Sequence, residues 1–174
     1  MLVVAATERE LEGVRGAETL CCGIGPVEAA ARTAAALVEQ RPEAVLHIGL
    51  AGSRTLEPLT VVLGSIAVYE DFSAAIPIVD HVDPDEALLA RCRAWLPDAL
   101  VLPIGTSAAV GGSGRCEVEA MEGFGVLRAC ALAGVPAVEL RVVANSPDEP
   151  DRAKWQLGDA LAVLRATLER LDVV

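Results

Sequence analysis

Two glutamates in small or apolar surroundings are the residues of this chain best placed to do chemistry. Glu122 follows Met121 and stands in front of a helical run of small residues. Glu10 comes just past an apolar opening run, Leu2–Ala6. A third polar cluster, Arg141–Asn145, closes another apolar run. Since open α/β sheets bind small molecules where their strands end, the three clusters predict an enzyme site assembled from distant segments.

For an isolated glutamate, the ordinary interpretation is a solvated surface charge. Glu10 and Glu122, however, have apolar or small neighbours and stand at a strand end or a helix start. A carboxylate in a pocket is therefore as well supported at these two positions as a surface charge. Taken alone, these residues indicate an α/β domain with a candidate carboxylate site and leave both interpretations open.

Metal and nucleophilic chemistry have weaker support. The segment Asp80–Glu86 contains carboxylates and His81, which are common metal ligands. We favour an acidic loop in which Asp83 caps a helix beginning at Pro84. The other histidine, His47, lies inside an apolar run and is predicted to be packed in the core. Because a Gly-x-Ser-x-Gly elbow is also missing, we expect neither a metal site nor a nucleophilic triad.

A glycine turn at Gly23–Val27 follows an apolar run and opens a helix, as phosphate-binding turns do. The third glycine of a dinucleotide fingerprint is replaced by Glu28, which would repel a pyrophosphate. We therefore favour a structural tight turn.

Length and charge limit the classes of function. The 174 residues, 53% of them hydrophobic, fit one domain over 1–174 with a sizeable core. The net charge of −11 opposes binding to nucleic acid or to an anionic membrane surface. We see no signal peptide and no run of about 18 apolar residues, so a soluble cytoplasmic protein is expected.

The cysteines are odd in number and lack C-x-x-C spacing, which argues against a disulfide framework or a zinc knuckle. They are Cys21, Cys22, Cys92, Cys116 and Cys130. We expect small, reduced thiols that are mostly buried and carry no chemistry.

Strand-like and helical runs alternate along the chain. Apolar runs bounded by turn residues predict strands at Leu2–Ala6, Thr19–Gly23, Ala44–Gly49, Gly64–Asp71, Leu100–Ile104 and Ala137–Asn145. Helical periodicity predicts helices at Val27–Glu39, Pro84–Trp95, Glu122–Ala133 and Pro150–Leu171, and loops at Leu50–Leu63, Ser73–Asp83 and Thr106–Glu117. The alternation predicts a three-layer α/β/α fold with a central, largely parallel or mixed sheet.

Five motifs in order resemble the nucleoside phosphorylase and nucleosidase superfamily, and within it the futalosine hydrolases. They are Ala5–Glu10, Cys22–Ala30, His47–Gly52, Val118–Gly123 and Arg141–Asn145. The resemblance implies a phosphorylase/hydrolase-like α/β fold and an enzyme without metal or organic cofactor. It implies hydrolysis of futalosine to hypoxanthine and dehypoxanthine futalosine, a step of menaquinone biosynthesis.

The resemblance also implies residue roles. Glu10 would orient and deprotonate a water, with Arg141 nearby, and Glu122 would accept hydrogen bonds from the ribose hydroxyls. The proposed wall of the substrate site consists of Met121 against the ribose, Ala108, Ala109 and Val110 at the base, and Leu50. Cleavage builds positive charge on the sugar and negative charge on the base, so carboxylates near the sugar and a donor at N7 fit this reaction.

Asn145 indicates the class of base. Adenine-specific members carry an aspartic acid at this position, whereas the asparagine is similar to members that handle 6-oxopurines. The amide would meet the N7/O6 edge of the purine. It can also pair with adenine, so an adenine-releasing methylthioadenosine/adenosylhomocysteine nucleosidase stays as the first alternative.

Two further functions are alternatives to futalosine hydrolysis. A phosphorylase is disfavoured because His47 and Leu50 stand where that branch tends to place arginine and serine. An inactive nucleoside-binding or scaffolding paralogue would not need to retain the glutamates.

The segments between Glu10 and Gly23 and over Ser73–Asp83 are shorter than in the superfamily, and Ala108 replaces a stacking aromatic. We therefore expect a homodimer or higher homo-oligomer whose partner subunit completes the wall.

Overall fold

The computed structural model describes residues 1–112 and 114–171 of the chain. Its strands are β1 (Leu2–Ala5), β2 (Glu18–Cys21), β3 (Val45–Ser53), β4 (Val61–Tyr69), β5 (His81–Val82), β6 (Leu100–Thr106), β7 (Val118–Ala120) and β8 (Ala137–Asn145). Its helices are α1 (Glu8–Leu11), α2 (Pro26–Gln40), α3 (Glu86–Trp95), α4 (Gly123–Ala133) and α5 (Leu157–Leu168), with a 3₁₀ turn, η1, at Arg152–Lys154. Position 113 and positions 172–174 of the predicted domain lie outside the described residues.

The strands of this part of the chain form one mixed sheet. Strand β1 lies between β2 and β3 and is parallel to both. Strand β8 runs parallel to β3 and antiparallel to β4. Because β4 continues through β6 and β7 back to β3, the pairings close on themselves. This closure brings the ends of β3, β7 and β8 together at one edge.

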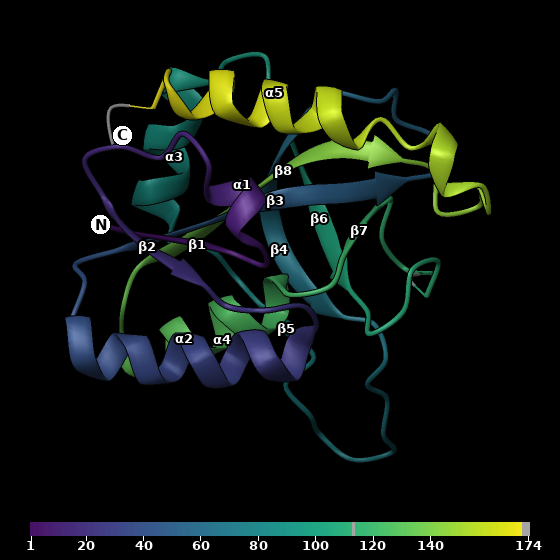
Figure 1. Cartoon of the computed structure of the whole chain (residues 1–174). Coiled ribbons are helices and arrows are strands. Elements are labelled where there is room, and N and C mark those ends of the chain that lie inside the picture. Colours follow the sequence, from purple (N-terminus) through teal and green to yellow (C-terminus); the bar gives the residue numbers. More distant parts are fainter. Residues whose placement is uncertain (113, 172–174) are drawn as a thin grey trace.

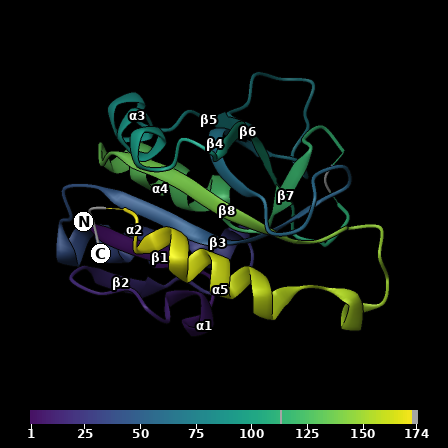
Figure 2. The same cartoon turned by 90° about the horizontal axis from the view of Figure 1, so that it is seen from above.

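Helices cover both faces of the sheet (Figure 1). On one face, α2 and α4 lie side by side, and Val4 and Val126 belong to one buried apolar cluster. On the other face, which Figure 2 shows from above, α3 and α5 cover a second cluster that contains Ile48, Leu88 and Leu164. Burial of these side chains on both faces is the main stabilising contribution to such a fold. The predicted three-layer α/β/α fold with a central mixed sheet is confirmed.

The predicted loop Leu50–Leu63 is wrong at both ends. Strand β3 continues through Ser53, because its backbone pairs with β8 as far as Gly52, opposite Asn145. Strand β4 begins at Val61, which pairs with Val142. Tertiary pairing here overrides the loop signal of the glycines.

The last helix begins later than predicted. Instead of starting at Pro150, the chain makes η1, whose cap is Asp151, and α5 starts at Leu157. The Gln156 amide donates to the carbonyl of Ala144 at 2.8 Å, which ties this turn to the end of β8. The predicted cap at Asp83 is also wrong, because Asp85 caps α3 by accepting from the Leu88 amide.

The cysteines are free thiols, as predicted, and three of the five are buried. Burial raises the pKa of Cys22 to about 12, so this thiol stays protonated and unreactive near neutral pH. In the described part of the chain no cluster of metal-ligating side chains is found. None of the described helices is both long enough and apolar enough to span a bilayer.

Candidate active site

The ends of β1, β3, β7 and β8 surround a pocket of about 290 Å³. Its polar lining includes Thr7, Arg9, Glu10, Glu119, Glu122 and Asn145, and its apolar lining includes Ile24, Leu50, Val110, Met121, Trp155, Leu157 and Leu161. This size is at the lower end of the range for small-molecule sites. The site residues predicted at Glu10, Leu50, Met121, Glu122 and Asn145 therefore meet in one cavity.

Glu10 is held by donors on both of its carboxylate oxygens. Oε1 accepts from the Leu50 amide at 3.0 Å. Oε2 accepts from the amide and the hydroxyl of Thr7 at 3.0 and 2.8 Å. Because Glu10 is at the third position of the short helix α1, its side chain reaches back to Thr7 at the helix start. The result is a fixed carboxylate acceptor with its edge toward the pocket.

Glu122 comes from the junction between β7 and α4. Its Oε1 accepts from the Gly25 amide at 3.1 Å, and its Oε2 lies 3.7 Å from an Arg141 nitrogen. Burial raises the pKa of Glu122, and the charge of Arg141 and the Gly25 amide oppose this rise. The turn at Gly23–Val27 thus presents an amide to a carboxylate, in agreement with the structural turn that we favoured.

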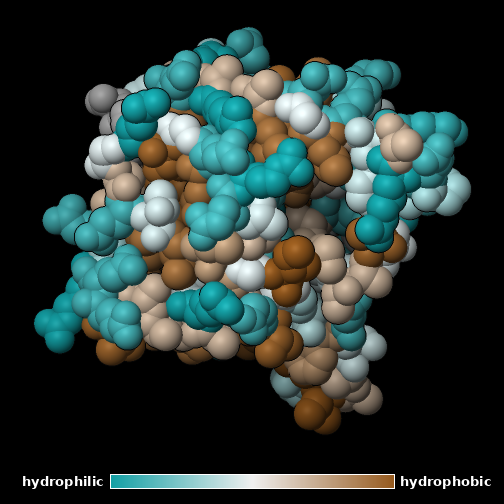
Figure 3. Space-filling model, viewed as in Figure 1, coloured by the Kyte–Doolittle hydropathy of each residue, from teal (hydrophilic) through white to brown (hydrophobic). Residues whose placement is uncertain are grey.

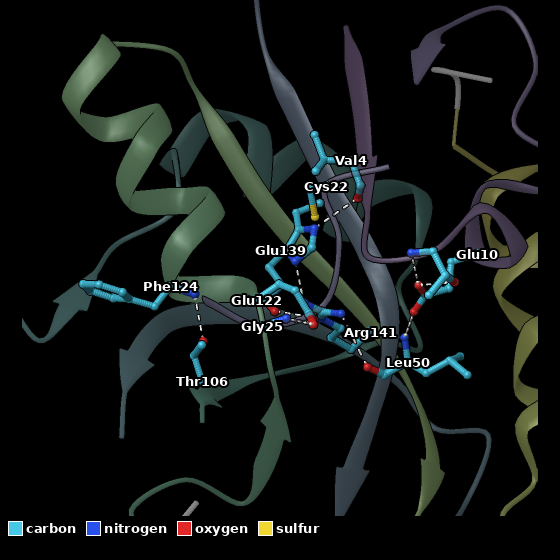
Figure 4. Close-up of polar contacts among 12 residues, drawn as sticks. Val4, Glu10, Cys22, Gly25, Leu50, Thr106, Glu122, Phe124, Glu139 and Arg141 are labelled. Carbon is cyan, nitrogen blue, oxygen red and sulfur yellow. Dashed lines mark hydrogen bonds and ion pairs between the residues drawn. The ribbon is translucent and has the colours of Figure 1, made fainter. Parts of the chain in front are cut away.

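Arg141 is buried and is not among the residues that line the pocket. Figure 4 shows its contacts with the residues around it. Its side chain is fully buried and donates from Nε to Glu139 at 2.7 Å and from a terminal nitrogen to the Leu50 carbonyl at 3.4 Å. A second terminal nitrogen contacts Nε2 of His47. Burial alone would lower the pKa of Arg141, but the surrounding carboxylates, Glu139 first, raise it.

The contact with Arg141 fixes the tautomer of His47. A guanidinium has no acceptor, so Nε2 must accept and Nδ1 must carry the proton that bonds to the Val4 carbonyl at 3.0 Å. Burial and the charge of Arg141 hold the pKa of His47 well below its usual range. The predicted core position of His47 is confirmed.

Glu139 is a buried partner that the sequence analysis missed. It sits two residues before Arg141 on β8, so both side chains lie on the same face of the strand. Opposite charges at this spacing in an otherwise apolar run were the available signal. One oxygen of Glu139 binds Arg141, and the other has no hydrogen-bond partner among the described residues.

Gly49 allows the two charged groups to approach each other. A side-chain carbon at this position would lie 2.8 Å from Oε1 of Glu10 and would collide with the guanidinium of Arg141. Both groups therefore fit against the β3 backbone only because residue 49 is glycine.

Asn145 and Glu119 mark one end of the pocket. Both lie beside Gly52, where an added carbon would be 3.3 Å from the Asn145 amide nitrogen and 3.4 Å from Cγ of Glu119. Glu119 also accepts from the Gly111 amide at 2.6 Å, which holds the neighbouring loop against this end. Val110 belongs to the lining here, as predicted.

Ala108 and Ala109, which were predicted to line the base site, are not among the pocket residues. Asp71 holds their segment, because it accepts from the Ser107 hydroxyl at 2.9 Å and from the Ala108 amide at 2.6 Å. Arg141 likewise acts from behind the wall.

The sequence analysis missed Arg9, Glu119 and the C-terminal wall of Trp155, Leu157 and Leu161, which the predicted continuous helix at Pro150–Leu171 obscured.

The arrangement can stabilise a cation and activate a polar molecule. Two carboxylates, Glu10 and Glu122, come from different segments and face one cavity. An amide side chain, Asn145, offers both a donor and an acceptor at one end. Such a set fits a reaction in which positive charge develops on the ligand near the carboxylates.

Known proteins resemble the chain in sequence and in structure. The profile of the Phosphorylase superfamily matches residues 18–119. A curated relative, futalosine hydrolase of Streptomyces coelicolor, is 34% identical over 192 aligned positions, which cover 91% of this chain and 80% of the relative.

Two solved structures illustrate the similarity in fold. Native futalosine hydrolase of Helicobacter pylori superposes with a TM-score of 0.87 at 16% identity, covering 98% of this chain and 95% of that one. The S-adenosylhomocysteine nucleosidase of Streptococcus pyogenes superposes with a TM-score of 0.85 at 17% identity, covering 99% and 95%.

Proposed function

Since this chain belongs to the phosphorylase superfamily, we propose that it is a nucleosidase that hydrolyses the N-glycosidic bond of futalosine. The products are hypoxanthine and dehypoxanthine futalosine. The observation that carries the proposal is the 34% identity to a futalosine hydrolase over 91% of the chain. The meeting of Glu10, Glu122 and Asn145 in one pocket supports it.

The two carboxylates act on the sugar. As the bond to the base lengthens, positive charge develops on the ribose, and Glu122 stabilises it while accepting hydrogen bonds from the hydroxyls. Glu10 is oriented by Thr7 and the Leu50 amide, and it takes a proton from the water that attacks the anomeric carbon. Met121 packs against the ribose, and Leu50 forms the adjacent wall.

Arg141 is a positioning residue for this chemistry. It is buried behind the pocket with its charge 3.7 Å from Oε2 of Glu122. This charge opposes the rise in the pKa of Glu122 that burial causes, and so favours the ionised carboxylate that the ribose requires. Its contacts with Glu139 and His47 fix the guanidinium in place.

Asn145 reads the departing base. Its amide donates to the N7/O6 edge of hypoxanthine, where negative charge develops during cleavage. Since hypoxanthine is a better leaving group than adenine, it needs less help from an acid, and an amide suffices. Val110 contributes to the apolar wall at this end.

Water is the proposed nucleophile, with no metal or organic cofactor. In a phosphorylase an anion-binding side chain must point into the site. Here His47 is fully buried and its ring nitrogens bind Val4 and Arg141, and Leu50 offers no polar side chain. These two positions support hydrolysis over phosphorolysis.

The proposed enzyme is a homodimer or higher homo-oligomer. It acts in the cytoplasm, in menaquinone biosynthesis. Two pocket residues on the rim, Ile24 and Val110, are 64% and 44% exposed. The loop between β4 and β5 also exposes apolar side chains, and Figure 3 shows brown atoms at the tip of this projection. A partner subunit that covers such surfaces would complete the wall. Sedimentation of an active 18 kDa species alone would contradict this.

Incubation with three nucleosides tests the function. Futalosine, inosine and methylthioadenosine are supplied separately, and the released base is identified by chromatography. We expect hypoxanthine from futalosine at the highest kcat/KM. Preferred release of adenine from methylthioadenosine would identify the alternative nucleosidase, and no release from any of them would identify an inactive paralogue.

A further inference from the structure

Glu139 is the one fully buried carboxylate among the described residues, and it does not line the pocket. Its Oε1 accepts from Nε of Arg141 at 2.7 Å, and its Oε2 has no hydrogen-bond partner in the described part of the chain. Both oxygens lie against Gly123, the first residue of α4, where an added side-chain carbon would collide with them. Burying a carboxylate with an unsatisfied oxygen costs free energy, which points to a role in the neighbouring site.

The surroundings of Glu139 favour its ionised form. The guanidinium of Arg141 is always charged, and Glu139 is the nearer of the two carboxylates that pair with it. The positive end of the α4 dipole, at Gly123, also stabilises a negative charge. Burial raises the pKa of Glu139, and the charge of Arg141 opposes this rise. Glu139 therefore supplies the closest countercharge of the buried guanidinium.

Arg141 stands between two carboxylates and binds only Glu139 directly (Figure 4). The terminal nitrogen that contacts His47 lies 3.7 Å from Oε2 of Glu122, beyond the range of a hydrogen bond. The other terminal nitrogen donates to the Leu50 carbonyl. Each nitrogen of the guanidinium thus has a partner other than Glu122. The two-bond fork that arginine forms most strongly with a carboxylate is not made with Glu122.

We propose that Glu139 is a positioning residue that holds the guanidinium of Arg141 away from Glu122, so that Glu122 keeps Oε2 for the ribose hydroxyls. This inference rests on the proposed function, in which Glu122 accepts those hydrogen bonds. Oε1 of Glu122 already accepts from the Gly25 amide, so a fork with Arg141 would occupy the remaining oxygen. At 3.7 Å the charge of Arg141 still favours the ionised carboxylate, but its donors do not compete with the sugar.

The sugar hydroxyls test this proposal, because they report on Glu122. Each nucleoside that the native protein cleaves is compared with its 2′-deoxy and 3′-deoxy derivatives, and the ratio of kcat/KM for the ribose substrate over each deoxy substrate is measured. Glu139→Gln keeps the shape and an acceptor but removes the charge, so Arg141 should close on Glu122. The ratio should then fall about tenfold relative to the native protein. Glu139→Asp, which retains the charge, should recover part of it.

A matched control separates this effect from a general loss of charge or of stability. Glu18→Gln removes one negative charge at an exposed position of β2 outside the pocket, and it should leave the ratio as in the native protein. A merely structural role of Glu139 would lower kcat/KM equally for the ribose and the deoxy substrates. Such an equal fall in Glu139→Gln would overturn the inference, while hypoxanthine release by the native protein would still support the nucleosidase.

Crystal structures separate the inference from the proposed function, because they need no turnover. In Glu139→Gln the distance from Arg141 to Oε2 of Glu122 should shorten from 3.7 Å to about 2.9 Å, a direct hydrogen bond. This shortening would support the inference even if no nucleoside is cleaved and the proposed function fails. An unchanged distance would overturn it. A direct hydrogen bond between Arg141 and Glu122 in crystals of the native protein would also overturn it, whether or not the variant folds.

Discussion

Glu10 and Glu122 differ in what holds them, and this difference agrees with the roles proposed for them. Three donors, from Thr7 and Leu50, satisfy the oxygens of Glu10 from the protein side. Glu122 receives one amide, from Gly25, and faces the buried charge of Arg141. The first arrangement suits a base of fixed orientation, and the second suits a carboxylate that remains ionised beside a developing cation.

Glu10→Gln and Glu122→Gln should each lower kcat by about two powers of ten or more. The first change removes the base for water, and the second removes negative charge beside the ribose. Stopped assays of hypoxanthine release measure both. Glu8→Gln serves as the control, because Glu8 is exposed on the same helix and does not line the pocket. Near-native turnover in either variant would remove the role assigned to it.

Asn145→Asp tests the reading of the base. An ionised aspartate would face the N7 and O6 acceptors of hypoxanthine, a pairing that costs about 1–3 kcal/mol. Adenine presents one donor and one acceptor there, so it is penalised less. The ratio of kcat/KM for futalosine over its aminated analogue should fall by about tenfold or more. A ratio equal to that of the native protein would mean that Asn145 does not read the base.

Glu10, Glu122 and Asn145 were candidates because each stands near the end of an apolar run, and the resemblance to nucleosidases supplied the roles expected of them. The partners of Arg141 were not found. His47 opens one of the motifs that carry the resemblance and Glu139 lies two residues before another, but neither motif shows that they contact Arg141. That contact comes from the parallel pairing of β3 with β8, where His47 lies opposite Glu139. Such register is a tertiary property that local periodicity does not encode.

At the scale of elements, β3 positions most of the site. Its backbone supplies the Leu50 amide to Glu10 and the Leu50 carbonyl to Arg141, and Gly49 lets both side chains approach. The core of the fold was predictable because long apolar runs carried strong periodicity. Short elements such as α1 and β7 were not, since four and three residues give too little pattern.

Gly49→Ala is expected to displace both Glu10 and Arg141, because the added carbon would occupy the space of both side chains. We expect loss of activity by about two powers of ten and destabilisation by about 1–3 kcal/mol. Gly158→Ala is the matched control, since an added carbon meets nothing within 4 Å there and alanine favours the helix. Denaturant unfolding and hydrolysis assays report the two effects. Native activity in Gly49→Ala would contradict the close approach that we describe.

At the scale of the whole molecule, the buried cluster of His47, Glu139 and Arg141 links stability to pH. Because burial lowers the pKa of His47 in the folded state, the unfolded chain binds the extra proton. The contribution of His47 to stability is therefore fully present above its unfolded pKa, near 6.5, and is lost as the pH falls below that value toward the folded pKa. The slope for one proton is about 1.4 kcal/mol per pH unit.

His47→Gln should remove this dependence while retaining an acceptor for Arg141. The unfolding free energies measured at pH 5.5, 6.5 and 7.5 should differ less from one another in the variant than in the native protein. His81→Gln is the control, since His81 is exposed and pairs with Asp80 at the surface. An equal pH dependence in native protein and His47→Gln would mean that a different group carries the linkage.

The most direct test of the account is the fate of the sugar when futalosine is cleaved in ¹⁸O-labelled water with inorganic phosphate present. Mass spectrometry of the products distinguishes the two nucleophiles, because the new bond at the anomeric carbon takes its oxygen from one of them. We predict hypoxanthine together with dehypoxanthine futalosine that carries one ¹⁸O atom, at a rate independent of phosphate. Formation of a sugar 1-phosphate, or no release of hypoxanthine, would contradict the assignment of this pocket to futalosine hydrolysis.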